Sequence, residues 1–288
     1  MCCGIFLFNI VAMQTGPIGV FDSGYGGLTV LKSLTSALPD YDFIYLGDNA
    51  RAPYGTRSFE TVYRYTRSCV DWFFRQECPL VILACNTASA KALRTIQQQD
   101  LPHVEAFRRV LGVIRPTAEI IGSFSKSGHI GVLATPGTVA SLSYVIEIAK
   151  FFPDAIVHQQ ACPLWVPLIE NNEHLTAGAE YFVKACIDEL MQQDPLIDAV
   201  LLGCTHYPVL EETIRKYLPA GVQIISQGDI VAQSLRDYLN RHAEMAQRLS
   251  KGGIRQFFTT DNPADFDAHA PLFFDGHIHS QHADIGSA

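Results

Sequence analysis

The stretch VILACNTASA (residues 81–90) is an apolar run that ends in Cys85 and changes at once to small polar residues. The stretch VLLGCTHYPV (200–209) repeats this arrangement around Cys204. Runs that are short and apolar on both faces are typical of strands buried in parallel sheets. One cysteine in such a place is commonly a small buried apolar residue. Two cysteines in matching places indicate a shared site.

The rest of the chain alternates short apolar runs with longer helical patterns, which predicts an α/β fold with parallel sheets covered on both sides. The expected strands are 18–21, 42–47, 80–84, 129–134, 155–159, 199–203 and 222–226. The expected helices are 27–38, 58–76, 88–99, 138–152, 175–193, 209–217 and 229–249.

The chain also looks duplicated. IGVFDSG (18–24) resembles IGVLATPG (130–137), and the two cysteine stretches follow at a similar separation. Independent α/β strands also often contain Ile-Gly-Val, so chance similarity is the alternative. The duplication predicts two pseudo-symmetric three-layer α/β domains with mainly parallel sheets that face each other across a central active-site cleft. The expected division is an N-terminal extension (1–14), a first domain (15–105 plus 222–267), a second domain (106–221) and a tail (268–288).

Composition narrows the class of protein. The 288 residues are 48% apolar and 17% charged, with a formal net charge of −8, so we expect a packed globular protein that does not bind nucleic acid through a basic face. Eight cysteines without a C-x-x-C pair favour a reducing cytoplasm over a disulfide or zinc framework. The opening MCCGIFLFNIVAM lacks a basic start and is too short to span a membrane, so Met13 is a candidate start.

Ligands of open α/β sheets bind beyond the carboxyl ends of the strands, where both cysteines are expected. A thiol that precedes a helix lies near backbone N–H groups, so we expect a lowered thiol pKa. Two thiols across one cavity indicate that one removes a proton from a carbon and the other returns a proton to the opposite face. Asp22 and His206 are placed to assist as acids or bases. The candidate donors to a substrate carboxylate are Ser23, Asn86, Thr87, Thr135, Thr138 and Thr205.

Each of these residues also has a simpler interpretation. Asp22 is equally able to hold a turn, and His206 is equally able to be an ordinary loop histidine. The glycines of DSGYGG do not follow the spacing of a nucleotide-binding loop. The histidines of the C-terminal part, which lack a paired metal-ligand frame, are expected in a solvated tail; they are His269, His277, His279 and His282.

Six segments in order resemble the glutamate racemases of the aspartate/glutamate racemase family, over about residues 17–267. They are PIGVFDSGYGGLTVL, GDNARAPYGTRS, ILACNTASA, GVLATPGTVAS, ACPLWVPLIE and LLGCTHYPVL. This resemblance implies cofactor-independent racemisation of glutamate, which supplies D-glutamate for peptidoglycan. It implies no metal, a cytoplasmic location and no membrane or nucleic-acid partner, and a homodimer is expected.

The resemblance also assigns roles. Cys204 takes the α-proton of L-glutamate, and Cys85 delivers a proton to the other face. Asp22 assists Cys85, while His206 and Glu170 lie on the Cys204 side. The implied substrate-binding positions are Asp22, Ser23, Tyr54, Gly55, Asn86, Thr87, Thr135, Thr138, Thr205 and His206.

Three alternatives remain open, namely an aspartate racemase, a binding or regulatory protein that holds glutamate only as a ligand, and a thiol hydrolase. The second cysteine stretch argues against the last two, because neither needs a second thiol. Two departures from the family pattern stand out. Ser226-Gln227-Gly228 replaces a common Asp-Ser-Gly, which is expected to lie outside the chemistry, and the link at 103–116 is longer than usual.

Overall fold

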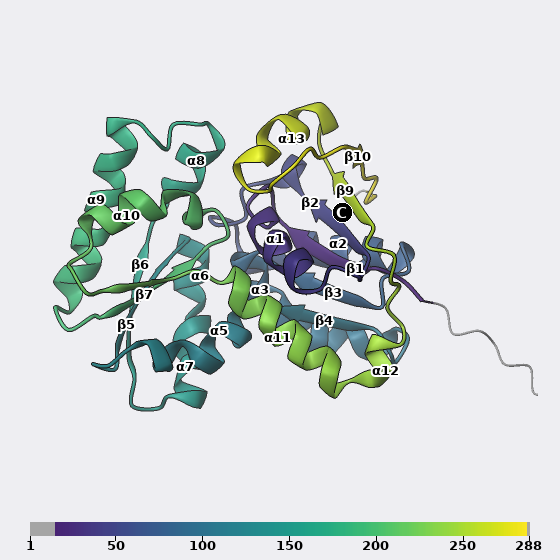
Figure 1. The fold of residues 1–288 in the computed structure, drawn as a ribbon, viewed down its shortest axis with the longest axis horizontal. Helices are drawn as coiled ribbons and strands as arrows, with labels where there is room; N and C mark the ends of the chain where they lie inside the picture. Colours follow the sequence, from purple (N-terminus) through teal and green to yellow (C-terminus); the bar gives the residue numbers. More distant parts are fainter. Residues whose placement is uncertain (1–14, 287–288) are drawn as a thin grey trace, which may run out of the picture.

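The structure is a computed structural model that describes residues 15–286. The expected extension (1–14), the candidate start Met13 and the last two residues lie outside the described residues. Two all-parallel sheets form the centres of two α/β domains that lie side by side (Figure 1). The predicted fold class is confirmed.

The first sheet has six strands in the order β10 (Ser280–His282), β9 (Arg255–Thr259), β2 (Phe43–Gly47), β1 (Ile18–Asp22), β3 (Leu80–Leu83) and β4 (Arg109–Gly112). The second has four strands in the order β6 (Ile156–Ala161), β5 (His129–Ala134), β7 (Ala199–Gly203) and β8 (Gln223–Ile225). The run β2-β1-β3-β4 therefore has the same order as β6-β5-β7-β8. This equivalence is the structural form of the expected duplication.

The helices are α1 (Leu28–Ala37), α2 (Phe59–Arg75), α3 (Asn86–Lys91), α4 (Leu93–Thr95), α5 (Ile114–Ile120), α6 (Pro136–Ser141), α7 (Ser143–Phe151), α8 (Trp165–Glu170), α9 (Ala177–Gln193), α10 (Glu211–Tyr217), α11 (Gly228–Arg241), α12 (Ala243–Ala246) and α13 (Pro263–His269). Shorter turns are η1 (Asn49–Arg51), η2 (Ile96–Asp100), η3 (Leu101–His103), η4 (Ile121–Phe124), η5 (Tyr207–Leu210) and η6 (Ala270–Leu272).

Each sheet is covered on both faces, because successive strand residues point to opposite sides and both sets are apolar. In β1, Val20 packs with α1 and α11, while Phe21 packs with α2. In β7, Leu202 packs with α9 and α10, while Leu201 packs with α5 and α7. Each domain is therefore three layers thick.

The strand pairing corrects the expected division of the chain at three places. The segment 109–112, expected in the second domain, is β4 and pairs with β3 of the first sheet. The segment 223–225, expected in the first domain, is β8 and pairs with β7 of the second sheet. Each of these segments is the fourth strand of its own repeat. If the two halves had been given equivalent strands, both segments would have been assigned to the correct domain.

The third correction concerns the expected solvated tail from 268 onward. Residues 280–282 form β10, which extends the first sheet beside β9. Phe273 is buried in the core. His277, His279 and His282 are exposed, as expected.

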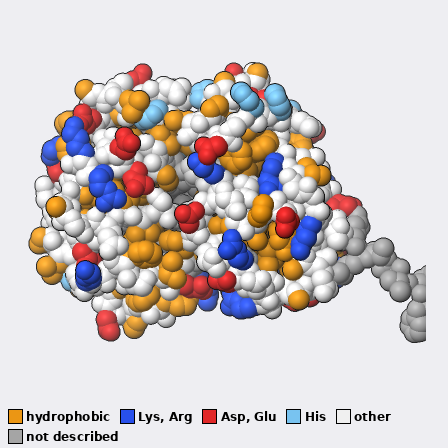
Figure 2. Space-filling view, in the orientation of Figure 1, with side chains coloured by type: hydrophobic (Ala, Val, Ile, Leu, Met, Phe, Trp, Pro, Cys, Tyr) orange, Lys and Arg blue, Asp and Glu red, His pale blue; other side chains and the backbone are white. Residues whose placement is uncertain are grey.

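The charged side chains on the face shown in Figure 2 are interspersed, and neither sign covers it continuously. Among the described residues, no helix has the length and apolar character needed to cross a membrane.

Candidate active site

The two cysteines lie at the equivalent switch points of the two sheets, where strand order reverses and ligands of such folds bind. Cys85 follows β3, beside β1, and Cys204 follows β7, beside β5. Both line one cavity of about 90 Å³ between the domains. Two chain segments far apart in sequence thus bring two thiols to one enclosed space.

Cys85 caps the amino end of α3. Its Sγ accepts the N–H of Ala88 at 3.5 Å, and the Ser23 hydroxyl lies 3.4 Å from it. Burial, followed by the nearby charge of Asp22, raises the pKa of the Cys85 thiol to about 12. The expected lowering of this pKa is therefore wrong, because burial outweighs two hydrogen bonds. At neutral pH Cys85 holds its proton.

Cys204 has a different environment. Its Sγ lies 3.9 Å from Nδ1 of His206, and Nε2 of His206 lies 3.0 Å from Oε1 of Glu170, at the end of α8. Burial alone would lower the pKa of His206, but hydrogen bonds with Cys204 and Glu170 raise it to about 10. His206 is consequently an imidazolium at neutral pH, and its Nδ1 faces the sulfur of Cys204.

Asp22 lies behind the cavity wall and is fully buried. It accepts the N–H of Gly24 at 3.0 Å and the hydroxyl of Thr205 at 3.2 Å. Burial raises the pKa of its carboxyl, although the charge of His206 opposes this. No hydrogen bond joins Asp22 to Cys85 among the described residues; its influence on that thiol is electrostatic.

The glycine loop allows the two domains to approach closely. A Cβ on Gly26 would lie 2.3 Å from Nδ1 of His206 and 2.5 Å from Oγ1 of Thr205. Thr29, at the start of α1, donates to the carbonyl of Thr205 at 3.0 Å. The DSGYGG segment therefore holds the loop that carries Cys204. Gly26 is required there because any side chain would overlap His206 and Thr205.

Three threonine hydroxyls meet across the domain boundary. Oγ1 of Thr87 lies 2.9 Å from Oγ1 of Thr135, and Thr135 donates to Thr138 at 3.1 Å. Thr87 and Thr135 line the cavity, whereas Thr138 lies behind Thr135 and is fully buried. The Thr87 hydroxyl is thus available to a bound anion, whereas the Thr135 hydroxyl must first turn its proton away from Thr138.

Of the other predicted binding residues, Tyr54 and Gly55 line the cavity. The Tyr54 hydroxyl is bonded to Asp48, so the ring faces the cavity and the oxygen does not. The carbonyl of Gly55 accepts the N–H of Gly137 at 2.7 Å, which joins the two domains at the cavity edge. The remaining predicted residues that line the cavity are Ser23, Asn86, Thr205, His206 and Glu170.

A buried amide network lies behind Asn86 and was not predicted from the sequence. Nδ2 of Asn86 donates to Oε1 of Gln227 at 2.7 Å. Nε2 of Gln227 lies 2.7 Å from the Tyr144 hydroxyl and 2.9 Å from Oγ1 of Thr117. Gln227 was expected to lie outside the chemistry, yet it fixes the residue that follows Cys85. The only available signal was the departure from Asp-Ser-Gly.

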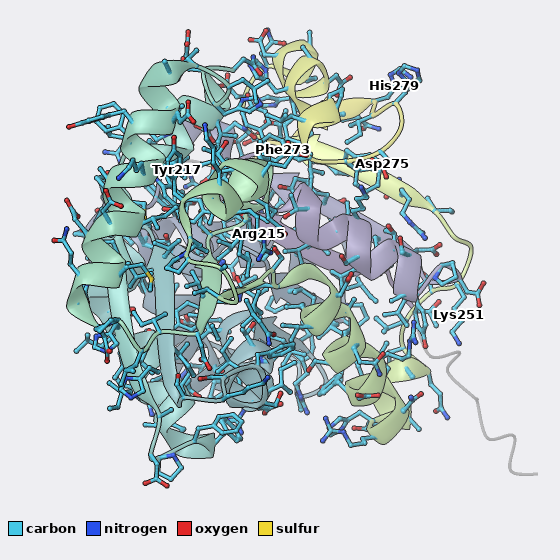
Figure 3. All side chains as sticks on the ribbon, turned by 60° about the vertical axis from the view of Figure 1, so that its left-hand side comes forward. Arg215, Tyr217, Lys251, Phe273, Asp275 and His279 are labelled. Carbon is cyan, nitrogen blue, oxygen red and sulfur yellow. The ribbon has the colours of Figure 1, made fainter. Side chains whose placement is uncertain are left out.

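The C-terminal part also contributes an unexpected residue. The ring of Phe273 lies edge-on to His206, with centroids 5.3 Å apart, and stacks on Tyr25. Figure 3 shows Phe273 where the C-terminal segment meets the second domain. This contact covers one side of the His206 ring and helps to shield it from solvent.

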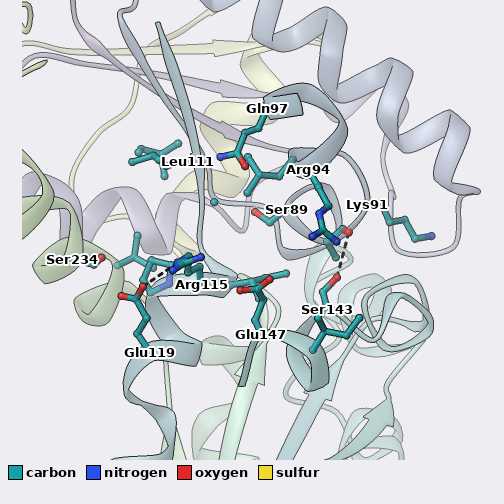
Figure 4. Close-up of a pocket in the computed structure, with 18 of the residues that line it drawn as sticks. Ser89, Lys91, Arg94, Gln97, Leu111, Arg115, Glu119, Ser143, Glu147 and Ser234 are labelled. Carbon is teal, nitrogen blue, oxygen red and sulfur yellow. Dashed lines mark hydrogen bonds and ion pairs between the residues drawn. The ribbon is translucent and has the colours of Figure 1, made fainter. Parts of the chain in front are cut away.

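A larger cavity of about 720 Å³ lies elsewhere between the domains (Figure 4). It shares no lining residue with the smaller cavity that Cys85 and Cys204 line, which we call the cysteine cavity. Within it, Arg115 pairs with Glu119, and Ser143 donates to the carbonyl of Ala90. The cysteine cavity is small compared with ligand clefts of roughly 300 Å³ and more.

Replacing Gln227 by leucine is expected to destabilise the fold by about 2 kcal/mol, because the buried amide of Asn86 loses its acceptor. Denaturant unfolding measures the change. Gln233→Leu is the matched control on α11, since that glutamine is exposed and its loss should stay within about 0.5 kcal/mol. Equal effects of the two substitutions would show that the amide network is unimportant.

The raised pKa of His206 predicts a pH-dependent stability. Its ordinary value is 6.5 and its folded value about 10, so its contribution is complete below pH 6.5 and is lost as pH rises toward 10. The stability difference between wild type and His206→Gln should shrink over that range. Exposed His103→Gln corrects for general effects of losing a histidine. A difference that is constant or grows with pH would contradict the ion pair.

Comparison with known proteins identifies the family of this chain. The profile described as Asp/Glu/Hydantoin racemase matches residues 18–235. A glutamate racemase of Ruegeria sp. (strain TM1040) is 42% identical over 89% of this chain and 96% of its own length. One of Geobacter metallireducens is 38% identical over 92% and 95%.

Solved structures of glutamate racemases are also similar to this chain. Glutamate racemase isoform RacE1 from Bacillus anthracis has a TM-score of 0.85 and 34% identity, over 94% of this chain and 98% of that one. The Francisella tularensis glutamate racemase in complex with D-glutamate has a TM-score of 0.83 and 32% identity, over 94% and 98%. The resemblance found in the sequence is confirmed, and the chain belongs to the Asp/Glu/Hydantoin racemase family.

Proposed function

We propose that this protein interconverts L-glutamate and D-glutamate by a two-base proton transfer that needs no cofactor. The observation that carries the proposal is the pair of thiols from equivalent strands in one closed cavity, with unequal surroundings. Cys85 holds its proton, and Cys204 faces an imidazolium. The proposal assigns the acid of the L-to-D direction to Cys85 and the base to Cys204.

In the L-to-D direction, the Cys204 thiolate takes the α-proton of L-glutamate. The electron pair of the broken C–H bond moves into the α-carboxylate, and the Cys85 thiol gives its proton to the opposite face of the carbon. The α-carbon keeps all its substituents with inverted configuration. Cys204 ends as a thiol and Cys85 as a thiolate, so the site is set for the reverse reaction.

The α-proton is very weakly acidic, so the intermediate needs strong stabilisation. The hydroxyl of Thr87 can donate to a carboxylate, and the hydroxyl of Thr135 can do so after it turns its proton away from Thr138. The enclosed cavity excludes water and strengthens these interactions. In the D-to-L direction, the substrate ammonium lowers the pKa of Cys85, because a nearby positive charge favours the thiolate. Asp22 and Glu170 act through their neighbours, Asp22 by its charge and Glu170 by holding His206 protonated.

Glutamate is the proposed substrate because the relatives at 38–42% identity are named glutamate racemases. The Picrophilus torridus aspartate racemase has a TM-score of 0.51 and 17% identity, which indicates only a shared fold. The product D-glutamate would serve peptidoglycan synthesis. A cytoplasmic homodimer is the proposed state, and light scattering after size-exclusion chromatography measures its mass.

The test is polarimetry of purified protein with L-glutamate, D-glutamate, L-aspartate and D-aspartate, without added metal or cofactor. Both glutamate enantiomers should converge on a racemic mixture, and aspartate should react far more slowly. Faster aspartate turnover would establish an aspartate racemase. Glutamate binding without turnover in reduced, folded protein would establish a binding role.

A further inference from the structure

Two histidines and an aspartate meet at the end of the second domain opposite the cysteine cavity. His129 is the first residue of β5, His158 lies in β6, and Asp194 follows α9. His129 pairs in register with Ile156, and Gly131 pairs with His158, so the two histidines are diagonal neighbours on one face of the sheet. A Cβ on Gly131 would lie 2.8 Å from Leu190 of α9, so this face is the one α9 covers.

The donor atoms of the three residues converge. Nδ1 of His129 lies 2.5 Å, and Nε2 of His158 lies 2.9 Å, from the same oxygen, Oδ2 of Asp194. All three donor atoms lie within 4.8 Å of one another, and no other such group occurs in residues 15–286. The second carboxylate oxygen, Oδ1, accepts the N–H of Leu196 at 2.8 Å, which fixes the carboxylate. The side chains are 15–20% exposed, so an ion can reach them from solvent.

We propose that His129, His158 and Asp194 bind one divalent transition-metal ion of the Zn²⁺ type. Two imidazole nitrogens and one carboxylate oxygen are a preferred ligand set for such ions, and water completes the coordination. Metal–ligand bonds of about 2.0–2.2 Å require the donor atoms to lie somewhat further apart than hydrogen-bond distance, so the histidine side chains must move slightly away from Asp194 when an ion binds. Each histidine then presents a lone pair at the nitrogen that now faces Oδ2.

The fixed Oδ1 gives the site the outer hydrogen bond that oriented metal ligands commonly have. The ion would tie β5 and β6 to the end of α9. This end of the sheet is remote from the carboxyl ends that carry Thr135 and Cys204, so the ion is structural and takes no part in the reaction.

The test uses the full-length protein, reduced and free of oxygen, titrated with Co²⁺ and then with Zn²⁺ as competitor. One equivalent of Co²⁺ should give visible d–d bands without sulfur-to-cobalt charge transfer, because the site has no thiol. His158→Gln and Asp194→Asn should each weaken Co²⁺ binding by more than about tenfold, a lower bound set by the loss of an outer partner.

The matched control is His277→Gln combined with His279→Gln, two exposed histidines of the C-terminal part. This variant should bind Co²⁺ like wild type. Racemisation by His158→Gln and Asp194→Asn should be unchanged, which shows that both are folded. The proposal is overturned if wild type binds no equivalent of Co²⁺, if thiolate charge transfer accompanies binding, or if the two site variants bind as tightly as the control. None of these results depends on the proposed racemase activity.

Discussion

Replacing either Cys85 or Cys204 by serine is expected to lower kcat/KM for glutamate racemisation by about 10²- to 10⁴-fold in both directions, the range typical of losing an acid or base. A buried serine hydroxyl neither ionises readily nor gives up its proton as easily as a thiol. Because the two thiols serve opposite faces, neither can replace the other. Polarimetry with each enantiomer measures the loss.

Cys186→Ser is the matched control, since this half-buried cysteine lies outside the cavity and contacts the carbonyl of Ala161. Its activity should stay near that of wild type. Racemisation that survives in both Cys85→Ser and Cys204→Ser would refute the two-thiol mechanism. A comparable loss in Cys186→Ser would show that thiol removal acts through the fold.

Gly26→Ala should lower activity by about 10²-fold, because the new Cβ lies 2.3 Å from Nδ1 of His206 and forces the imidazolium away from Cys204. The same overlap should destabilise the fold by about 1–3 kcal/mol. Steady-state kinetics and denaturant unfolding measure the two effects separately.

Gly178→Ala is the control for this substitution. Gly178 lies in α9, and its added Cβ would meet nothing closer than 3.7 Å. Alanine there should stabilise by up to about 1 kcal/mol and leave activity intact. A Gly26→Ala enzyme as active as the Gly178→Ala enzyme would show that the glycine loop does not position His206.

The sequence predicted β1, β2, β3, β5, β6, β7 and β8 and missed β4, β9 and β10, although β6 and β8 are also only partly buried. β4 begins with an exposed arginine at the sheet edge, and β10 reads Ser-Gln-His. β9 is only partly buried, because the edge strand β10 covers it weakly. These strands form through pairing with distant segments, which local pattern does not reveal.

Some residues of the site were likewise predictable from the sequence, and others were not. Cys85, Cys204 and their hydroxyl neighbours were predictable because each lies directly after a recognisable strand. Gln227 was not, because its partners Asn86 and Tyr144 are remote in sequence. The raised pKa of Cys85 was also out of reach, since its cause is burial beside Asp22, which exists only in the fold.

The most direct test of the two-thiol mechanism is proton NMR of L-glutamate and D-glutamate in deuterated water with wild type, Cys85→Ser and Cys204→Ser. The wild type should place deuterium at the α-carbon of both enantiomers as optical purity is lost. Cys85→Ser, which keeps Cys204, should exchange only the α-proton of L-glutamate, and Cys204→Ser only that of D-glutamate, in each case without inversion. Loss of optical purity without deuterium at the α-carbon, or exchange of both enantiomers by one single-cysteine variant, would contradict the mechanism.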